Sequence, residues 1–388
     1  MMIEKHTYRD RDSQVEVTQL TDYRGHSHHF YFTNPGWYAG GRKLLFGSDR
    51  NNLTNLYGVD LESGEIEQLT ELAPVPLPRE LEFVRACKNP QREEAYFFHD
   101  LSLLALDLET RQTRVLYETE PGWCVSQLNC SADGERMYFG DYEDMSSRFP
   151  VDLLRGYVGF RETWEAKPLS RVVEVSVDGS GSRVVFEERY WIGHVNTSPI
   201  QPYLLTFCHE GPWHLVDNRI WGLDARSGNA WKIRPTGPGE IVGHEYWYAN
   251  GEWIGYHGQK AAGQEASGER PGGDFFLGRI HYDGTRQVES AFPGHTGHIF
   301  SNDENLIVGD GGKLIRVWQW DDQRQRYRGP RLLCRHDSSM HIQQTHPHPR
   351  ISPGGDYLVF TSDRTGYGNV YTVPLVDFEL LPEIEQGR

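Results

Sequence analysis

Residues 343–349 (QQTHPHP) place two histidines on either side of one proline, with a glutamine just upstream. His346 and His348 are two positions apart where a strand-like segment begins, so their side chains are expected to point the same way. The prolines remove backbone donors and stiffen the segment, which lowers the entropy cost of holding both rings in place. With the amide oxygen of Gln343, this short stretch could supply several ligands to a divalent cation.

A repeated pattern indicates which elements would complete such a site. Residues 40–70 and 354–375 share a turn, an alternating apolar strand, a Ser-Asp-Arg loop and a second alternating strand. The spacing of the weaker copies is about 50 residues, which is typical of propeller blades built from four antiparallel strands. We count seven such units, and they begin near residues 26, 79, 123, 192, 242, 296 and 343.

The sequence therefore predicts an all-β protein, a single seven-bladed β-propeller domain over residues 1–388 with four antiparallel strands in each blade. Aromatic residues make up 12% of the chain, and its 41 Gly and 21 Pro suit short strands and tight turns better than helices. Residues 13–21 resemble the fourth strand of a blade, so we expect them to complete the last blade and remove its exposed edge. Residues 145–171 break the pattern and are predicted to be an insertion in the third blade.

Histidines recur where the innermost strand of a blade should begin. Innermost strands of a propeller all start on one face, around the central channel, so these side chains are expected to converge there. The histidines at these positions are His26, His194, His244, His298 and His346. The loop at 208–219, which contains His209, should open on the same face. We treat His26, His194 and His209 as candidates for substrate binding.

His298, Gln343, His346 and His348 form the predicted metal site. Three imidazoles and one amide oxygen are neutral ligands, which suit a borderline ion such as Mn²⁺ better than Ca²⁺. Because no ligand is anionic, the ion would keep its charge for a bound anion. Any one of these histidines could equally be a polar group that lines a wet channel; the four together favour a metal.

Composition excludes several classes of partner. The net charge of −16 argues against nucleic acid, since phosphate binding requires a basic surface. The five cysteines are scattered without a CxxC spacing, which argues against a disulfide framework or a thiolate zinc site. No apolar stretch approaches the length of a membrane span, and the N-terminal residues have no signal-like apolar core. We expect a cytoplasmic protein without membrane or nucleic-acid partners.

Four segments together resemble the oligogalacturonate lyase family: FCHEGPWHLVDNRIW, GHEYW, GHIFSNDENLIVGDG and QQTHPHPRISPGGDYLVFTSD. The resemblance spans nearly the whole chain and is strongest in the last four blades. It implies a seven-bladed propeller that binds Mn²⁺ and cleaves short pectin-derived oligogalacturonides by β-elimination. The chain departs from the family in a short sixth-blade segment, GDGGKLIRVW, and in HSHHFYF of the first blade.

The resemblance also implies roles for individual residues. His298, Gln343, His346 and His348 match the positions that hold the family's metal. His244 matches the proposed base that removes the C5 proton and leads to a 4,5-unsaturated product, and Arg219 matches an arginine that approaches the reacting sugar.

Three alternatives stay open at this point. The propeller could be a binding or interaction module without chemistry. It could be a β-eliminating lyase for a different oligouronide. It could also be a metal-dependent hydrolase, which needs a carboxylate as acid or base; Glu210 and Glu245 are the nearest candidates.

Overall fold

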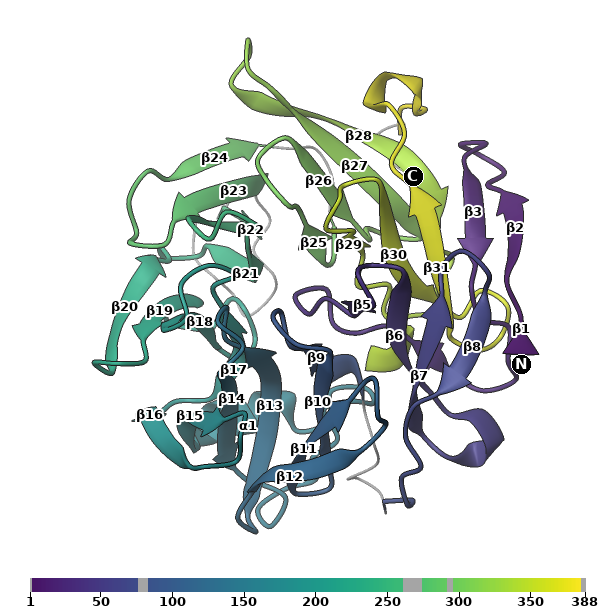
Figure 1. Ribbon diagram of the computed structural model, residues 1–388. Coiled ribbons are helices and arrows are strands. Elements are labelled where there is room, and N and C mark those ends of the chain that lie inside the picture. The colour runs from purple at the N-terminus through teal and green to yellow at the C-terminus, as the bar shows by residue number, and fades with distance from the viewer. Residues whose placement is uncertain (1, 76–82, 261–273, 292–295, 385–388) are drawn as a thin grey trace.

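Antiparallel β-sheets stand around a central axis in the computed structural model, as Figure 1 shows. The structure describes residues 2–75, 83–260, 274–291 and 296–384. Within these residues the strands form seven sheets, which are the seven blades of a β-propeller. The predicted fold class is therefore confirmed. The expected start of the second blade, near residue 79, lies outside the described residues.

Most blades have four strands, and the second to sixth blades each use consecutive strands of the chain. The first blade contains β4 (Ser27–His28), β5 (Trp37–Tyr38), β6 (Lys43–Ser48), β7 (Asn55–Asp60) and β8 (Glu65–Gln68), the second contains β9 (Cys87–Lys88), β10 (Glu94–His99), β11 (Ser102–Asp107) and β12 (Thr113–Glu118), and the third contains β13 (Trp123–Cys130), β14 (Arg136–Glu143), β15 (Leu169–Ser176) and β16 (Ser182–Arg189). The fourth blade contains β17 (Ile192–Thr197), β18 (Leu204–His209), β19 (Ile220–Asp224) and β20 (Asn229–Arg234), and the fifth contains β21 (Ile241–Trp247), β22 (Trp253–Gln259), β23 (Phe275–His281) and β24 (Val288–Ala291). The sixth blade contains β25 (Ile299–Phe300), β26 (Leu306–Gly309), β27 (Leu314–Asp321) and β28 (Arg326–Arg335), and the seventh contains β29 (Arg350–Ile351), β30 (Tyr357–Ser362) and β31 (Asn369–Pro374).

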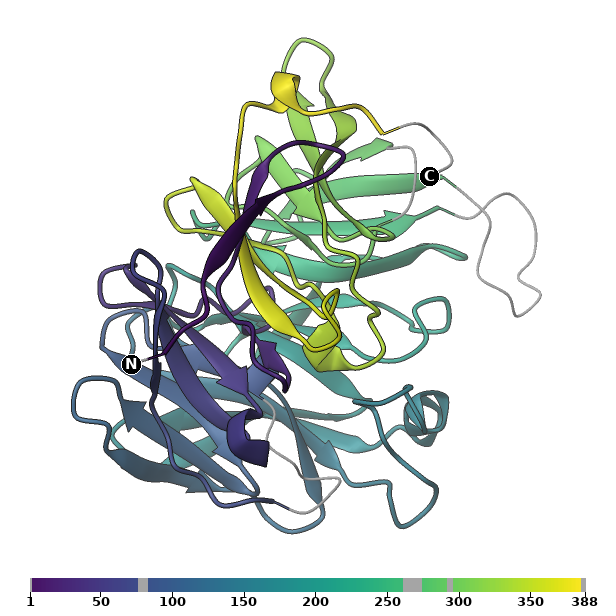
Figure 2. The same ribbon diagram turned by 90° about the vertical axis from the view of Figure 1, so that its right-hand side faces the viewer.

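The N-terminal segment closes the ring. Strand β3 (Glu16–Gln19) pairs with β31, with Thr18 opposite Thr372, and so becomes the fourth strand of the last blade as predicted. Strand β2 (His6–Arg9) adds a fifth strand outside β3, and β1 (Met2–Ile3) pairs with β8 of the first blade. Figure 2 shows these N-terminal strands beside β31. Since the same segment is part of both end blades, it covers edges that would otherwise be open to pairing.

The hydrophobic core lies between neighbouring blades. Leu45 and Leu56 of the first blade pack in one buried cluster with Phe97 and Leu106 of the second. The middle strands are covered on both faces, so they read as nearly continuous apolar runs rather than a strict alternation. This packing makes the scaffold that holds the inner strand ends in place.

Bulges in the innermost strands redirect side chains toward the axis. The strand register shifts within three innermost strands, between Val125 and Leu128, between Gly193 and Asn196, and between Gly243 and Tyr246. His194 and His244 lie within two of these bulges and have positive φ angles of 46° and 51°. A β-bulge re-aims a side chain, and left-handed backbone in a residue other than glycine is concentrated at functional sites.

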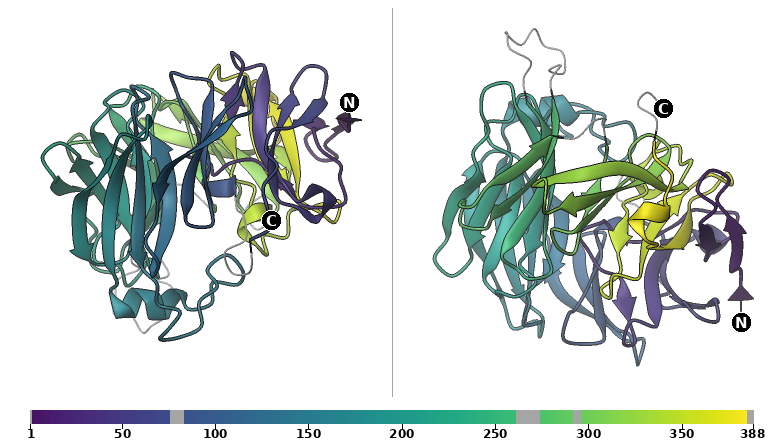
Figure 3. Two further views of the ribbon diagram at one scale, coloured as in Figure 1. Left: turned by 60° about the horizontal axis from the view of Figure 1, so that its bottom comes forward. Right: turned by 90° about the horizontal axis from the view of Figure 1, so that it is seen from above.

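Between β14 and β15 the chain makes a long excursion that carries α1 (Phe160–Ala166). Figure 3, left, shows α1 beyond the strand ends on one face of the ring. Arg155 of this excursion forms a β-bridge with Ile342, which precedes the 3₁₀ helix η3 (Gln343–Thr345) of the last blade. The excursion therefore crosses from the third blade to the seventh. Within the described residues, the helices are too short or too polar to span a bilayer.

Candidate functional site

A cavity of about 640 Å³ lies among the starts of the innermost strands, beneath the excursion that carries α1. Its lining includes His194, His244, His298, His346 and Gln343 from the predicted set. Arg219 also lines it. The repeat pattern thus placed most of the candidate residues around one space, although they come from four different blades.

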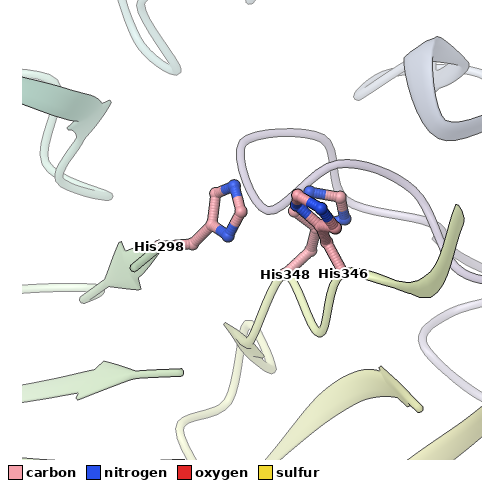
Figure 4. A group of neighbouring side chains, drawn as sticks. All are labelled: His298, His346 and His348. Carbon is pink, nitrogen blue, oxygen red and sulfur yellow. The ribbon is translucent and has the colours of Figure 1, made fainter. Parts of the chain in front are cut away.

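His298, His346 and His348 form a group that we call the imidazole cluster. One ring nitrogen of each lies within 4.8 Å of the other two, and the three side chains are buried. In Figure 4, His298 reaches from one strand toward the two rings of the His-Pro-His turn. Their ring centroids are 4.4–5.6 Å apart. This spacing is compatible with three imidazoles that share one ion.

The hydrogen bonds of these rings leave lone pairs for a ligand. Nε2 of His346 donates to the Met340 carbonyl at 3.1 Å, while its Nδ1 has no hydrogen-bond partner within the described residues. Nε2 of His348 is likewise buried and without a partner there. Nδ1 of His298 is bound to Asp310 Oδ2 at 2.9 Å, which leaves its Nε2. Buried polar atoms are nearly always satisfied, so nitrogens without a partner among the described residues, at this spacing, fit a site that binds an ion.

Burial keeps His346 and His348 neutral. It lowers the pKa of His346 to about 4, with a further contribution from His298. Burial and the neighbouring histidines also lower the pKa of His348 well below its usual value. Neutral imidazole is the form that binds a metal. The residues present therefore fit a borderline divalent ion.

Gln343, the fourth predicted ligand, lies on η3 and lines the same cavity. Its Nε2 donates to the Tyr157 hydroxyl at 2.8 Å. The bond leaves the amide oxygen for another partner and ties the last blade to the excursion from the third. Tyr157 has a positive φ of 54°, a further strained residue at this site.

His244 lies beside the imidazole cluster, with its ring centroid 4.4 Å from that of His298. Its Nδ1 is 2.8 Å from the Gly297 carbonyl and 2.8 Å from Nε2 of His257. A carbonyl only accepts, so Nδ1 carries the proton and Nε2 keeps its lone pair. Burial, followed by the charges of His298 and His257, lowers the pKa of His244 well below its usual value. The ring is thus a neutral base with a fixed tautomer.

Arg219 is held between two carboxylates. Its Nη1 donates to Glu210 Oε1 at 2.8 Å and its Nε to Glu245 Oε2 at 3.4 Å. Burial would raise the pKa of Glu210, but Arg219 and His194 outweigh it and hold that pKa well below its usual value. Both carboxylates are engaged with Arg219, which argues against their use as the acid or base of a hydrolase.

His194, Cys208 and Glu210 form a second group with metal-ligand spacing, which we call the Glu210 cluster. Its donor atoms are already used by one another. His194 Nε2 is 3.1 Å from Glu210 Oε2, and the Cys208 thiol contacts the same carboxylate oxygen at 3.7 Å. Burial raises the pKa of Cys208 well above its usual value, so its sulfur stays protonated. The Glu210 cluster orients Arg219 and offers no thiolate to a metal.

Two candidates for substrate binding lie outside the cavity lining. Nδ1 of His26 accepts from the Gly368 backbone at 3.0 Å, so this ring fastens the first blade to the last. His209 is buried between Glu188 and Asp217, at 2.7 Å from each, and stacks on Tyr190. His209 ends β18 with its side chain packed in the blade, and the prediction did not account for this strand alternation.

Sequence reasoning missed two partners that hold the site together. Asp310 is buried and orients His298, and His257 contacts His244. The aspartate directly follows β26 in the segment IVGDG, a polar residue at a strand end, which was the available signal. His257 lies in the middle of β22 and had no comparable signal, because only the strand register brings it against His244.

The fold and the cavity together define a β-propeller protein with a buried, histidine-rich, metal-type site. Comparison with protein families gives the particular class: residues 1–378 match the model of the oligogalacturonate lyase family, and the chain belongs to that family. Its members are carbon–oxygen lyases, so the alternative of a non-catalytic interaction module is not supported.

Individual relatives agree with this assignment. The chain is 26% identical to an oligogalacturonate lyase of Dickeya dadantii and 25% identical to an oligogalacturonide lyase of Pectobacterium atrosepticum, over 96% of each chain in both cases. It superposes with a TM-score of 0.84 on an oligogalacturonate lyase in complex with manganese, at 25% identity over 98% of both chains. A crystal structure of the lyase from Vibrio parahaemolyticus gives a TM-score of 0.82 at 25% identity, over 97% of this chain and 98% of that one.

Proposed function

We propose that this protein cleaves short oligogalacturonides by β-elimination, with a divalent cation, most simply Mn²⁺, held by His298, His346, His348 and Gln343. The observation that carries the proposal is the pair of orphaned, buried imidazole nitrogens on His346 and His348 beside the neutral base His244. The manganese in the related lyase supports the choice of ion.

The charges around the cavity explain why an ion is needed. Glu210, Glu245 and Asp310 lie around Arg219 and the imidazole cluster, and the whole chain carries −16. A uronate carboxylate would be repelled by this surplus of negative charge. When bound, a divalent ion supplies positive charge that offsets the carboxylate and makes the neighbouring C5 proton easier to remove.

His244 and Arg219 then have separate roles in the reaction. His244 takes the C5 proton on Nε2, and the electron pair of that bond forms the C4–C5 double bond as the C4–oxygen bond breaks. The leaving oxygen takes a proton from water, and the proton that His244 accepted is then released to the hydroxide that remains. Nδ1 of His244 stays bound to the Gly297 carbonyl, which holds the ring in place as it becomes charged. Arg219, already fixed by Glu210 and Glu245, presents its remaining N–H groups to the anionic sugar without reorganisation.

A panel of short oligouronides tests this proposal directly. Purified protein is incubated with di- and trigalacturonate and with oligomers of other uronic acids, with and without Mn²⁺ after chelator treatment. We expect ultraviolet absorbance from a 4,5-unsaturated product with the galacturonides, only when the ion is present. Reducing ends without that absorbance would indicate hydrolysis, and a stronger signal from another uronide would reassign the substrate.

A further inference from the structure

Strand β13 lies across the ring axis from β25 and β29 (Figure 1), and the cavity lining on this side differs from the lining near the imidazole cluster. This wall is made by Arg85, the last residue of the 3₁₀ helix η2 (Phe83–Arg85), by Gln127 of β13, and by aromatic rings. This wall contains none of the predicted metal or base residues. We therefore expect this wall to contact a different part of the ligand from the part that lies at the metal ligands and the base.

Gln127 is a buried polar side chain on this wall. It is 6% exposed and lines the cavity, and its Nε2 has no hydrogen-bond partner within the described residues. The residue sits in the β13 bulge, one position after Ser126, which occupies the place of His194 and His244 in the bulges of the fourth and fifth blades. A buried amide donor is costly to leave unsatisfied, so its presence here indicates an acceptor that arrives with a ligand.

Arg85 lines the same wall. Its Nη1 donates to the carbonyl of Val125 at 2.8 Å, and Gln127 is two residues further along the same bulge. Trp191 contacts Tyr142 and Phe160 with ring centroids 5.6 and 5.2 Å apart, and all three line the cavity. A guanidinium and an amide donor beside an aromatic surface suit a carboxylate carried on a sugar ring.

We propose that Arg85 and Gln127 bind the carboxylate of the sugar next to the one held at the imidazole cluster. The inference rests on the proposed function, because an oligogalacturonide carries one carboxylate on every sugar. The ion would compensate one of them, and Arg85 and Gln127 line the same cavity on a wall that contains none of the predicted metal ligands. Arg85 and Gln127 thus determine specificity: they select a chain of uronates over a substrate with a single acidic sugar.

Two substrates and a variant of Arg85 test this role. On digalacturonate, Arg85→Gln should lower kcat/KM roughly 10- to 100-fold, mainly through KM, since a charge-assisted hydrogen bond is lost. On the digalacturonate whose non-reacting sugar is methyl-esterified, wild type should already show a comparable loss, and Arg85→Gln should add little. Arg85→Lys, which keeps the charge, should fall between wild type and Arg85→Gln.

Gln127→Leu provides an independent arm that leaves Arg85 intact. It should lower kcat/KM on digalacturonate roughly tenfold or less and have no effect on the ester. Arg161→Gln is the matched control, because Arg161 is exposed on α1 and pairs only with Glu165 among the described residues. Metal content and Tm are measured for every variant to show that each one is folded and loaded.

The outcomes separate this inference from the proposed function. If wild type forms no unsaturated product from any galacturonide, the proposed function fails. If wild type is active but Arg85→Gln and Gln127→Leu match it on digalacturonate, or lose equally on both substrates, the assignment of this wall is overturned while the lyase activity stands.

Discussion

The imidazole cluster and the Glu210 cluster have the same ligand spacing, yet their donor atoms are in opposite states. In the imidazole cluster, nitrogens of His346 and His348 are buried without a partner within the part of the chain that is described. In the Glu210 cluster, His194 and Cys208 both contact the glutamate, which also binds Arg219. Spacing alone therefore does not define a metal site; the lone pairs must also be left over once the protein's own hydrogen bonds are made.

The difference also separates two electrostatic tasks. The imidazole cluster offers ligands that carry no negative charge, so an ion bound there would retain its positive charge. In the Glu210 cluster, Glu210 binds the guanidinium of Arg219, which also contacts Glu245 outside the cluster, so the charge of Arg219 is largely compensated. One group would supply net positive charge to the substrate, and the other supplies a rigid hydrogen-bonding surface.

Removing a ring from the imidazole cluster should have the largest effect. We expect His346→Ala to lose stoichiometric divalent metal and, with it, turnover, because the remaining ligands cannot replace the missing imidazole. Metal analysis of protein purified without chelator and the product assay with added Mn²⁺ check the two losses. Full metal content in this variant would contradict the role given to His346.

Changing the base should separate turnover from metal binding. His244→Gln is expected to lower kcat by roughly 10²- to 10⁴-fold, the usual contribution of a positioned proton acceptor, with metal content unchanged. Single-turnover measurements at saturating substrate isolate the chemical step. Wild-type turnover would reassign the base, and a parallel loss of metal would place His244 among the ligands instead.

Asp310 should show an intermediate effect, because it acts through His298. Replacing it with Asn keeps the shape and removes the charge that orients the ring through the 2.9 Å contact. We expect metal affinity to fall roughly 10- to 100-fold, with kcat largely restored by excess Mn²⁺. Isothermal titration calorimetry with Mn²⁺ measures the affinity. An unchanged affinity would show that His298 is positioned by its backbone alone.

The sequence predicted the fold and the location of the site, but not the direction of every side chain. Repeats every 50 residues or so predicted the ring, and histidines at strand starts predicted which face holds the site. The side chains of His26 and His209 could not be placed in this way, because their direction depends on local pairing with Gly368 and with Glu188. Bulges in the inner strands were equally invisible, since one extra residue changes the direction of a side chain without changing the pattern of residue types.

The smallest effect is expected from the thiol of the Glu210 cluster, and it is the most direct test of the comparison. Cys208→Ala removes one of the three residues with ligand spacing but no atom that an ion would use, because the buried thiol stays protonated. Metal content and metal affinity should match wild type, and stability should fall by about 1 kcal/mol from the lost packing. Metal titration of this variant, in parallel with His346→Ala, measures metal content and affinity, and thermal unfolding measures stability. A drop in metal content comparable to that of His346→Ala would mean that the two clusters share ligands, and the distinction between occupied and free lone pairs would fail.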